Sequence, residues 1–187
     1  MLEVRALELE GVLEIRPARY ADDRGFFSEV WSNARWRGAG VDAEFVQDNH
    51  SLSKQRGVLR GLHFQAPPMA QAKLVRVTRG AVFDVAVDIR AGSPTYGRWV
   101  STILSAERWN QLFIPAGFAH GFVTLETDCE VHYKVSAPYS AEHDRAIRFD
   151  DPSIAIEWPV AKDDLILSDK DQAAPLLAEV QTGFGYP

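Results

Sequence analysis

The sequence predicts an all-β protein folded as an antiparallel barrel or jelly roll. Short segments of alternating polar and apolar residues recur along the chain, separated by Gly, Pro, Asn and Asp. The clearest is 82–90, VFDVAVDIR, in which the four apolar residues from Phe83 to Ile89 share one face, whereas Asp84 and Asp88 share the other. The clearest helical patterns are short, which also favours a β fold.

The remaining elements follow from the same alternation and from turn residues. In chain order, strands are expected at 12–15, 58–65, 73–78, 82–90, 100–104, 111–114 and 130–135. Short peripheral helices are expected at 32–38 and at 169–174, the latter capped by Ser168. The 187 residues suit a single domain, 1–187, in which about 176–187 form a loose tail.

Composition restricts the function. A net charge of -6 argues against nucleic acid as a partner. The N-terminus carries charged residues throughout, unlike a signal peptide, and no apolar run approaches the roughly 20 residues that span a bilayer. The single cysteine, Cys129, cannot form an internal disulfide, which favours a reducing compartment. We therefore expect a cytoplasmic protein with no membrane partner.

Two histidine segments interrupt the strand pattern. In 60–65, RGLHFQ, a regular strand would direct His63 to one face and Arg60 to the other, and Gly61 predicts a bulge that re-aims its neighbours. In 115–122, PAGFAHGF, glycines and a proline predict a tight bend that presents His120. Taken alone, His63 is equally consistent with a hydrogen-bonded structural residue, and the second segment is better explained as a hairpin that carries an incidental histidine.

Three further groups have both a structural and a functional interpretation. Tyr133 shares a face with valines and should point inward, as a packing residue or as an acid, whereas His132 and Lys134 should point outward. Lys73 lies on an apolar face, which is costly unless it is paired, used, or able to extend to the barrel mouth. The segment 168–171, SDKD, is typical of a helix N-terminus.

The histidines do not form the pattern of a metal-dependent barrel. The Pro-x-Gly-x-x-His turn is present at 115–120, but His63 is followed by Phe64 and Gln65, so the His-x-His pair is missing. No carboxylate follows before Lys73. Two histidines and a lysine make a poor site for a divalent ion. No dinucleotide-binding glycine fingerprint is present. The sequence therefore predicts no metal and no cofactor.

Eight segments of the chain are distinctive when they are taken together. The segments are 23–29 (DRGFFSE), 47–53 (QDNHSLS), 57–65 (GVLRGLHFQ), 71–75 (QAKLV), 88–99 (DIRAGSPTYGRW), 114–122 (IPAGFAHGF), 131–134 (VHYK) and 167–171 (LSDKD). In order and number they resemble the TDP-4-keto-6-deoxyglucose (dTDP-4-dehydrorhamnose) 3,5-epimerase family, the cupin-fold enzymes of TDP-rhamnose synthesis. The resemblance extends from about Gly11 to Pro175.

The resemblance implies a cupin-type jelly roll and a role for each matched residue. His63 resembles the general base, held by Asp171, Tyr133 the acid on the opposite face of the sugar, and Lys73 the group nearest the enolate oxygen. Sugar or diphosphate contacts are implied for Arg60, His120 and Lys170. Nucleotide contacts are implied for Arg24, Phe27, Glu29, Gln47 and Asn49, with Tyr139 a candidate for stacking on the base.

The resemblance also implies a homodimer in which the N-terminal segment of one subunit completes its partner's site. The strand at 12–15 could add to a partner's sheet. One departure stands out. Asp144, Arg145 and Ala146 occupy the place where the family often has Glu-Arg-Gly. We expect this change to alter a loop outside the catalytic set.

The implied chemistry is physically consistent. A ketone at C4 acidifies the hydrogens on C3 and C5, histidine titrates near neutral pH, and a neutral tyrosine can donate a proton. The resulting prediction is an isomerase that inverts C3 and C5 of a TDP-linked 4-keto-6-deoxyhexose. The alternatives are a relative that inverts only one carbon, a metal-dependent cupin enzyme, and a non-catalytic sugar-binding jelly roll.

Overall fold

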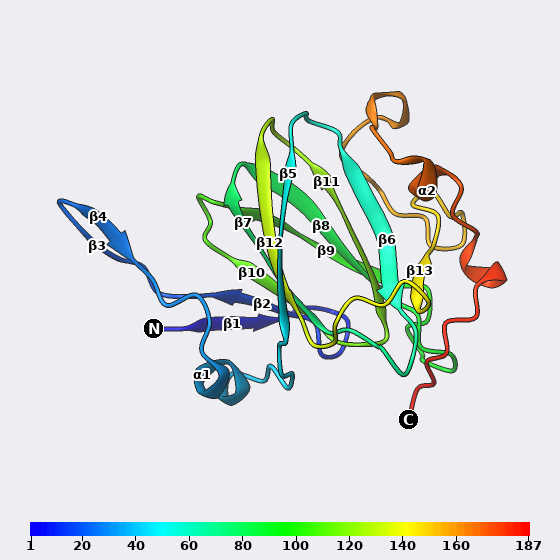
Figure 1. Ribbon diagram of the computed structural model, residues 1–187, viewed down its shortest axis with the longest axis horizontal. Helices are drawn as coiled ribbons and strands as arrows, with labels where there is room; N and C mark the ends of the chain where they lie inside the picture. Colours follow the sequence, from blue (N-terminus) through cyan, green and yellow to red (C-terminus); the bar gives the residue numbers. More distant parts are fainter.

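The computed structural model describes residues 1–187 and confirms the jelly roll. Two antiparallel sheets face one another (Figure 1). In spatial order, the six-stranded sheet comprises β1 (Glu3–Ala6), β2 (Leu13–Arg16), β10 (Gln111–Ile114), β7 (Lys73–Arg79), β12 (Cys129–Val135) and β5 (Gln47–Ser53). The five-stranded sheet comprises β13 (Asp144–Ala146), β6 (Leu59–Gln65), β11 (Phe118–Thr124), β8 (Ala81–Asp88) and β9 (Trp99–Ser105).

Helical structure is confined to the periphery, as predicted. The α-helices are α1 (Asn33–Gly38) and α2 (Asp169–Gln172), and the 3-10 turns are η1 (Lys162–Asp164) and η2 (Leu177–Glu179). Helix α1 buries Trp36 against Ile15, Leu74 and Phe113 on the outer face of the six-stranded sheet. No helix is long and apolar enough to cross a bilayer.

The main core lies between the sheets. Val75 and Val131 from the six-stranded sheet meet Val82 and Leu104 from the five-stranded sheet, and all four are buried. Burial of each such side chain contributes roughly 1.5–3 kcal/mol. This packing fixes the distance between the sheets and therefore the width of any cavity between them.

Strand β8 alternates as predicted, but both of its faces are buried. Val85 and Val87 pack against Leu177 and other residues outside the sheets. Asp84 and Asp88, which share the opposite face, are also fully buried. Residues 176–187, expected as a loose tail, contact the domain in the structure, since the backbone of Ala91 exchanges hydrogen bonds with 184–186.

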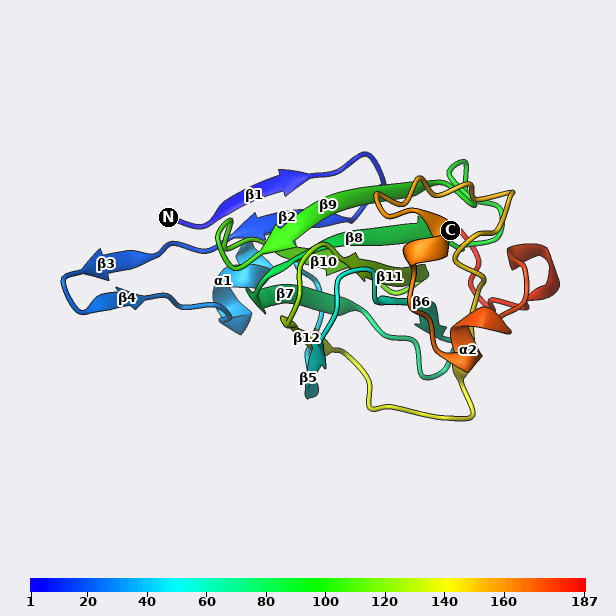
Figure 2. The same ribbon diagram turned by 90° about the horizontal axis from the view of Figure 1, so that it is seen from above.

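The N-terminal region differs from expectation. The strand predicted at 12–15 is β2, but β1 and β10 of the same chain occupy both of its edges, so it cannot add to a partner's sheet. The free edge belongs to β1. A hairpin of β3 (Tyr20–Asp22) and β4 (Gly25–Phe27) extends away from both sheets (Figures 1 and 2). Phe27, at the base of the hairpin opposite Tyr20, is 69% exposed.

Candidate active site

A cavity of about 470 Å³ opens between the two sheets, beside α2. Strands β5, β7 and β12 supply one wall, and β6 and β11 the other. Seven residues singled out from the sequence line it: Arg60, His63, Lys73, His120, Tyr133, Lys170 and Asp171. The structure therefore brings the four predicted catalytic residues into one site with three of the predicted substrate contacts.

A bulge in β6 directs Arg60 and His63 into the same cavity. His63 pairs with His120 of β11, and Arg60 pairs with Phe122, so two residues of β6 oppose Gly121 alone. Gly61 has φ of +132°, and a Cβ there would lie 2.5 Å from the Cα of Gly121. Only glycine fits. The predicted bulge is confirmed, and it corrects the regular-strand expectation that Arg60 faces away from His63.

His63 is held by a buried carboxylate. Its Nε2 lies 2.5 Å from Oδ1 of Asp171, and the Ser168 hydroxyl donates to Oδ2 of the same aspartate at 2.9 Å. Burial raises the pKa of Asp171, but the hydrogen bond and charge of His63, together with Ser168 and Lys170, bring the pKa below its ordinary value. With Nε2–H donated to Asp171, Nδ1 is the nitrogen that can accept a proton.

Segment 168–171 therefore both begins helix α2 and supplies the carboxylate that holds His63. Ser168 caps α2 by accepting the backbone N–H of Asp171, as its sequence pattern predicts. The same serine orients the carboxylate that holds His63. A structural helix cap thus positions a functional side chain.

Lys73 is buried within the cavity wall rather than extended to the barrel mouth. Its Nζ donates to the backbone oxygen of His63 at 3.2 Å. Burial lowers the pKa of Lys73 to about 8, partly opposed by the charges of Asp84 and Asp144. Lys73 therefore remains mainly a cation at pH 7.

His120 belongs to a second histidine–carboxylate pair that was not predicted. Its Nε2 donates to both carboxylate oxygens of Asp84, at 3.0 and 3.1 Å, and both side chains are buried. Burial lowers the pKa of His120 despite the opposing effect of Asp84. Asp84 lies between Val82 and Ala86 on one buried face of β8. The alternation of the sequence does not show that this face is buried, so it gave no signal for Asp84.

Tyr133 points inward, as predicted, and packs against the core cluster that contains Val75 and Val131. Burial raises the pKa of its hydroxyl, although Arg60 lowers it in part. Tyr133 is therefore a neutral proton donor near pH 7. His132 and Lys134 lie on the opposite face of β12, where Lys134 pairs with Asp48 at 2.7 Å.

Ser51 was not predicted but lines the same cavity. Its hydroxyl is the one buried side-chain polar atom of the chain that lacks a hydrogen-bond partner. Leaving such a group unpaired costs about 1–3 kcal/mol. Ser51 lies two residues from Asn49 on the same face of β5, and this spacing is the sequence signal for its place in the cavity wall.

A smaller cavity of about 230 Å³ adjoins the first and shares His63, Lys73, Tyr133 and Lys170 with it. Gln47, Asn49 and Tyr139, all expected on the nucleotide side, line this second cavity. The amide of Gln47 donates to Asn49 at 2.8 Å and accepts the backbone N–H of Tyr139 at 3.0 Å. These residues therefore form one preorganised polar edge.

The expectation that 144–146 form a loop is wrong. These residues form β13, which pairs with β6 so that Ala146 lies opposite His63 and Asp144 opposite Gln65. Asp144 lines the smaller cavity, where its carboxylate accepts hydrogen bonds from Lys170 and from the Tyr139 hydroxyl. The departure thus alters an edge strand beside the site, because sheet pairing over a long sequence separation decides its place.

Three predicted nucleotide contacts lie outside both cavities of their own chain. Arg24 pairs with Asp22 within the exposed hairpin, and Phe27 is exposed beside it. Glu29 pairs with Arg35 at 2.8 Å. The structure therefore does not bring these three residues together with His63.

The fold and cavity define a class of protein. A jelly roll that places a carboxylate-held histidine, a buried lysine cation and a neutral tyrosine around one cavity is suited to moving protons at carbon beside a carbonyl. The two cavity histidines already have carboxylate partners, Asp171 and Asp84.

Comparison with known proteins gives the family. Residues 6–179 match the model of the dTDP-4-dehydrorhamnose 3,5-epimerase family. The epimerase of that name from Sinorhizobium fredii is 55% identical over 97% of this chain and 93% of its own length. The chain belongs to the dTDP-4-dehydrorhamnose 3,5-epimerase family and is an isomerase of the epimerase type.

Solved structures agree. The dTDP-6-deoxy-D-glucose-3,5-epimerase of Legionella pneumophila, in complex with dTDP-4-keto-L-rhamnose, has a TM-score of 0.95 and 44% identity over all of both chains. A 3'-monoepimerase of Streptomyces bikiniensis, in complex with dTDP-quinovose, has a TM-score of 0.84 and 38% identity over 92% of this chain and 86% of its own. The fold is therefore shared by epimerases that differ in the number of carbons inverted.

Proposed function

We propose that this chain inverts C3 and C5 of a TDP-linked 4-keto-6-deoxyhexose, with His63 as base and Tyr133 as acid. The observation that carries the proposal is the placement of these two side chains on facing sheets around one cavity, His63 on β6 and Tyr133 on β12. Inversion needs proton removal on one face of a ring and return on the other. A base and an acid on opposite walls meet that requirement.

Proton removal would begin at His63. A C4 ketone acidifies the adjacent C–H bonds, because the electron pair left behind delocalises onto oxygen as an enolate. Nδ1 of His63 takes the proton, and the carboxylate of Asp171 at Nε2 stabilises the imidazolium that forms. Ser168 keeps that carboxylate oriented.

Lys73 would stabilise the enolate. Its ammonium is buried and its pKa is about 8, so Lys73 is mainly positively charged at pH 7. A preorganised charge of this kind acts on the oxyanion without reorganising at the moment of reaction.

Tyr133 would return a proton from the other wall. The raised pKa keeps its hydroxyl protonated before the reaction, and the Arg60 guanidinium favours the tyrosinate that forms afterwards. Repeating the sequence at the second carbon requires the ring to turn or the sugar to shift. Ser51, Arg60, His120 and Lys170 are the cavity groups that can hold the sugar and diphosphate.

The nucleotide would lie along the smaller cavity, against Gln47, Asn49 and Tyr139. We further propose a homodimer in which the exposed hairpin brings Arg24, Phe27 and nearby Glu29 to the partner's nucleotide edge. The exposed aromatic side chain of Phe27 supports this, since its own chain leaves it uncovered. A cytoplasmic location is supported by the single unpaired Cys129.

The dimer is tested by sedimentation at assay concentration. We expect a dimeric wild-type chain, and we expect Arg24→Ala combined with Phe27→Ala to raise KM for the TDP-sugar more than it lowers kcat. A fully active monomer of the wild-type chain contradicts the dimer.

A single-carbon epimerase is the second candidate function. The likeness to a 3'-monoepimerase at 38% identity favours it. Inversion at C3 alone would use the same base, acid and lysine, so the residues around the cavity do not separate the two activities. The number of carbons inverted has to be measured.

The experiment is incubation with TDP-4-keto-6-deoxyglucose in deuterated water, followed by NMR. We expect deuterium and inverted configuration at both C3 and C5. Deuterium and inversion at C3 alone would establish the second candidate. No exchange at either carbon would contradict both.

Exhaustive chelation tests the metal-dependent alternative. We expect full turnover after chelation, because the cavity offers the base, the acid and the oxyanion charge from side chains. Loss of turnover on removing stoichiometric zinc, iron or manganese, with recovery on adding it back, would favour a metal-dependent cupin enzyme.

A further inference from the structure

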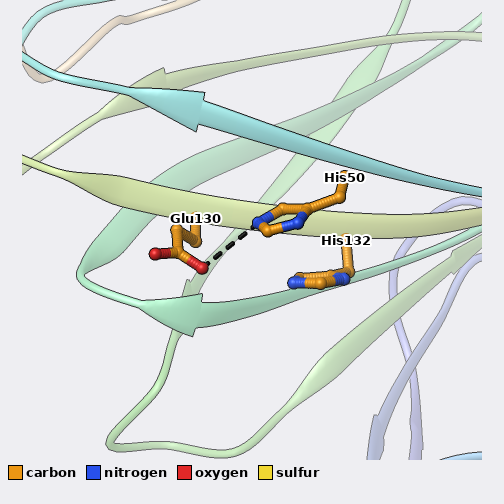
Figure 3. Close-up of side chains that lie close together, drawn as sticks. All are labelled: His50, Glu130 and His132. Carbon is orange, nitrogen blue, oxygen red and sulfur yellow. Dashed lines mark hydrogen bonds and ion pairs between the residues drawn. The ribbon is translucent and has the colours of Figure 1, made fainter.

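The outer face of β5 and β12 carries a cluster that the epimerase reaction does not use. It consists of His50, Glu130 and His132, and we refer to it as the outer histidine site. His50 and His132 are directly opposite one another in the antiparallel pair, and Glu130 lies two residues from His132 on the same face. Figure 3 shows the two rings stacked, with Glu130 beside them.

The three side chains are already close to a ligating arrangement. Their potential ligand atoms all lie within 4.8 Å of one another, and Nε2 of His50 is 3.1 Å from Oε2 of Glu130. The ring centroids of His50 and His132 are 3.9 Å apart, with planes inclined by 19°. Ligand atoms on a tetrahedral zinc ion lie roughly 3.4 Å apart, given bonds of about 2.1 Å. Because imidazole lone pairs lie in the ring planes, the two rings must turn out of this stacked arrangement to point at one ion.

We propose that the outer histidine site binds one divalent transition-metal ion of the zinc class. Two imidazole nitrogens and one carboxylate oxygen form the donor set that such ions prefer, and magnesium or calcium would prefer oxygen alone. The side chain of His50 is 51% exposed, so an ion can enter and water can complete its coordination.

The surrounding charges set the strength of this site. Asp48 lies on the same face of β5 and pairs with Lys134, and Arg76 of β7 lies opposite His132. Arg79, opposite Glu130, pairs with Asp128 at 3.8 Å. The cationic side chains offset part of the attraction of Glu130, so we expect a dissociation constant in the micromolar range rather than a tighter one.

The site lies on the reverse side of strands that serve the cavity. The inner face of β5 carries Gln47, Asn49 and Ser51, and the inner face of β12 carries Tyr133. A bound ion would cross-link β5, which is an edge strand, to β12. Binding to the folded chain alone raises the thermal unfolding midpoint as the ion concentration increases.

The test is titration of the full chain with Zn²⁺ by calorimetry, alongside thermal unfolding. We expect one ion per chain, a midpoint that rises with Zn²⁺, and at least tenfold weaker binding in His50→Ala and in the conservative Glu130→Gln. His143→Ala is the matched control, because it removes a histidine outside the cluster, and it should bind as the wild type does.

His63→Ala distinguishes this site from the cavity. We expect it to retain the wild-type affinity for Zn²⁺. Loss of binding in His63→Ala with retention in His50→Ala would assign the ion to the cavity and overturn the proposal. Absence of saturable binding by the wild-type chain, or equal binding by His50→Ala and Glu130→Gln, would also overturn it.

Discussion

Two histidines in the cavity each hold an aspartate, yet their surroundings differ. The side chain of His63 is 32% exposed and that of His120 is 8% exposed. Asp171 reaches His63 from α2 and shares a hydrogen bond with Ser168, whereas Asp84 reaches His120 from the neighbouring strand β8. The same pair of residue types therefore occurs twice in the cavity wall, once with a partly exposed histidine and once with a buried one.

The difference in access assigns different roles. A base must meet its substrate and then return its proton, and the partly exposed His63 can do both. Burial lowers the pKa of His120, which keeps that ring neutral and fixes it as a donor to Asp84. We infer that the His63 pair moves protons, while the His120 pair shapes the cavity and holds the sugar.

The largest expected effect on activity is that of His63→Ala. Loss of a general base typically lowers turnover by 10²- to 10⁴-fold, and we expect a loss in that range. Folding should change much less, because Asp171 keeps its Ser168 partner and water can enter the cavity. Deuterium exchange into substrate measures the effect, and His143→Ala is the control. A variant with half of wild-type exchange would remove His63 from this role.

For His120→Ala we expect the reverse, a larger loss of stability and a smaller loss of turnover than in His63→Ala. This change leaves the carboxylate of Asp84 buried without its imidazole partner, which we expect to cost about 3 kcal/mol of unfolding free energy. Activity of the folded fraction should fall less than in His63→Ala. Urea unfolding together with turnover checks both parts. A loss of turnover as large as that of His63→Ala, with little change in unfolding free energy, would make the two pairs equivalent and contradict the comparison.

Lys73→Met should lower kcat by about 10²- to 10³-fold, the cost of losing one oxyanion-stabilising group. In the wild-type chain, kcat/KM should decline above pH 8, where Lys73 loses its proton. The effect of Lys73 on the free energy of unfolding changes with pH in the opposite direction to its effect on kcat/KM. Between about 8 and 10.5 the unfolded chain binds the proton that the folded chain has lost, so this lysine makes stability rise with pH. An alkaline limb retained in Lys73→Met would assign it to another group.

A smaller effect is expected on acid stability in Asp171→Asn. The pKa of Asp171 is depressed in the folded chain, so its contribution to stability is present above the unfolded pKa and is lost as pH falls through the folded one. The difference in unfolding free energy between pH 7 and pH 3 should therefore be smaller in the variant. Equal acid sensitivity in the two chains would show that Asp171 gains nothing from His63.

Local pattern predicted much of this site. Lys73 and Tyr133 were placed correctly because each shares a strand face with valines, and that face turns out to be the interior. The resemblance supplied Asp171, which no local pattern connects to His63 over 108 positions. The residues that the sequence did not identify are those whose surroundings depend on which strands pair.

Asp84 and Asp144 show why the rest was missed. The alternation along β8 would be explained by a sheet with one buried face and one solvent-exposed face, in which Asp84 would face solvent. In the structure both faces of β8 are buried. Asp144 was expected in a loop, because three residues give too short an alternation to identify an edge strand. In both cases the environment comes from residues distant in the sequence, and only the assembled sheets supply it.

The central claim is that removal and return of the proton occur on facing walls of one cavity. Tyr133→Phe tests it most directly, because the ring keeps its packing against Val131 and only the hydroxyl is lost, so we expect little change in stability. Deuterium incorporation and product configuration should be measured together by NMR on the folded variant. We expect deuterium still to enter at C3, while net inversion falls steeply, most of all at C5. Undiminished inversion at both carbons would contradict the account and leave the acid unidentified.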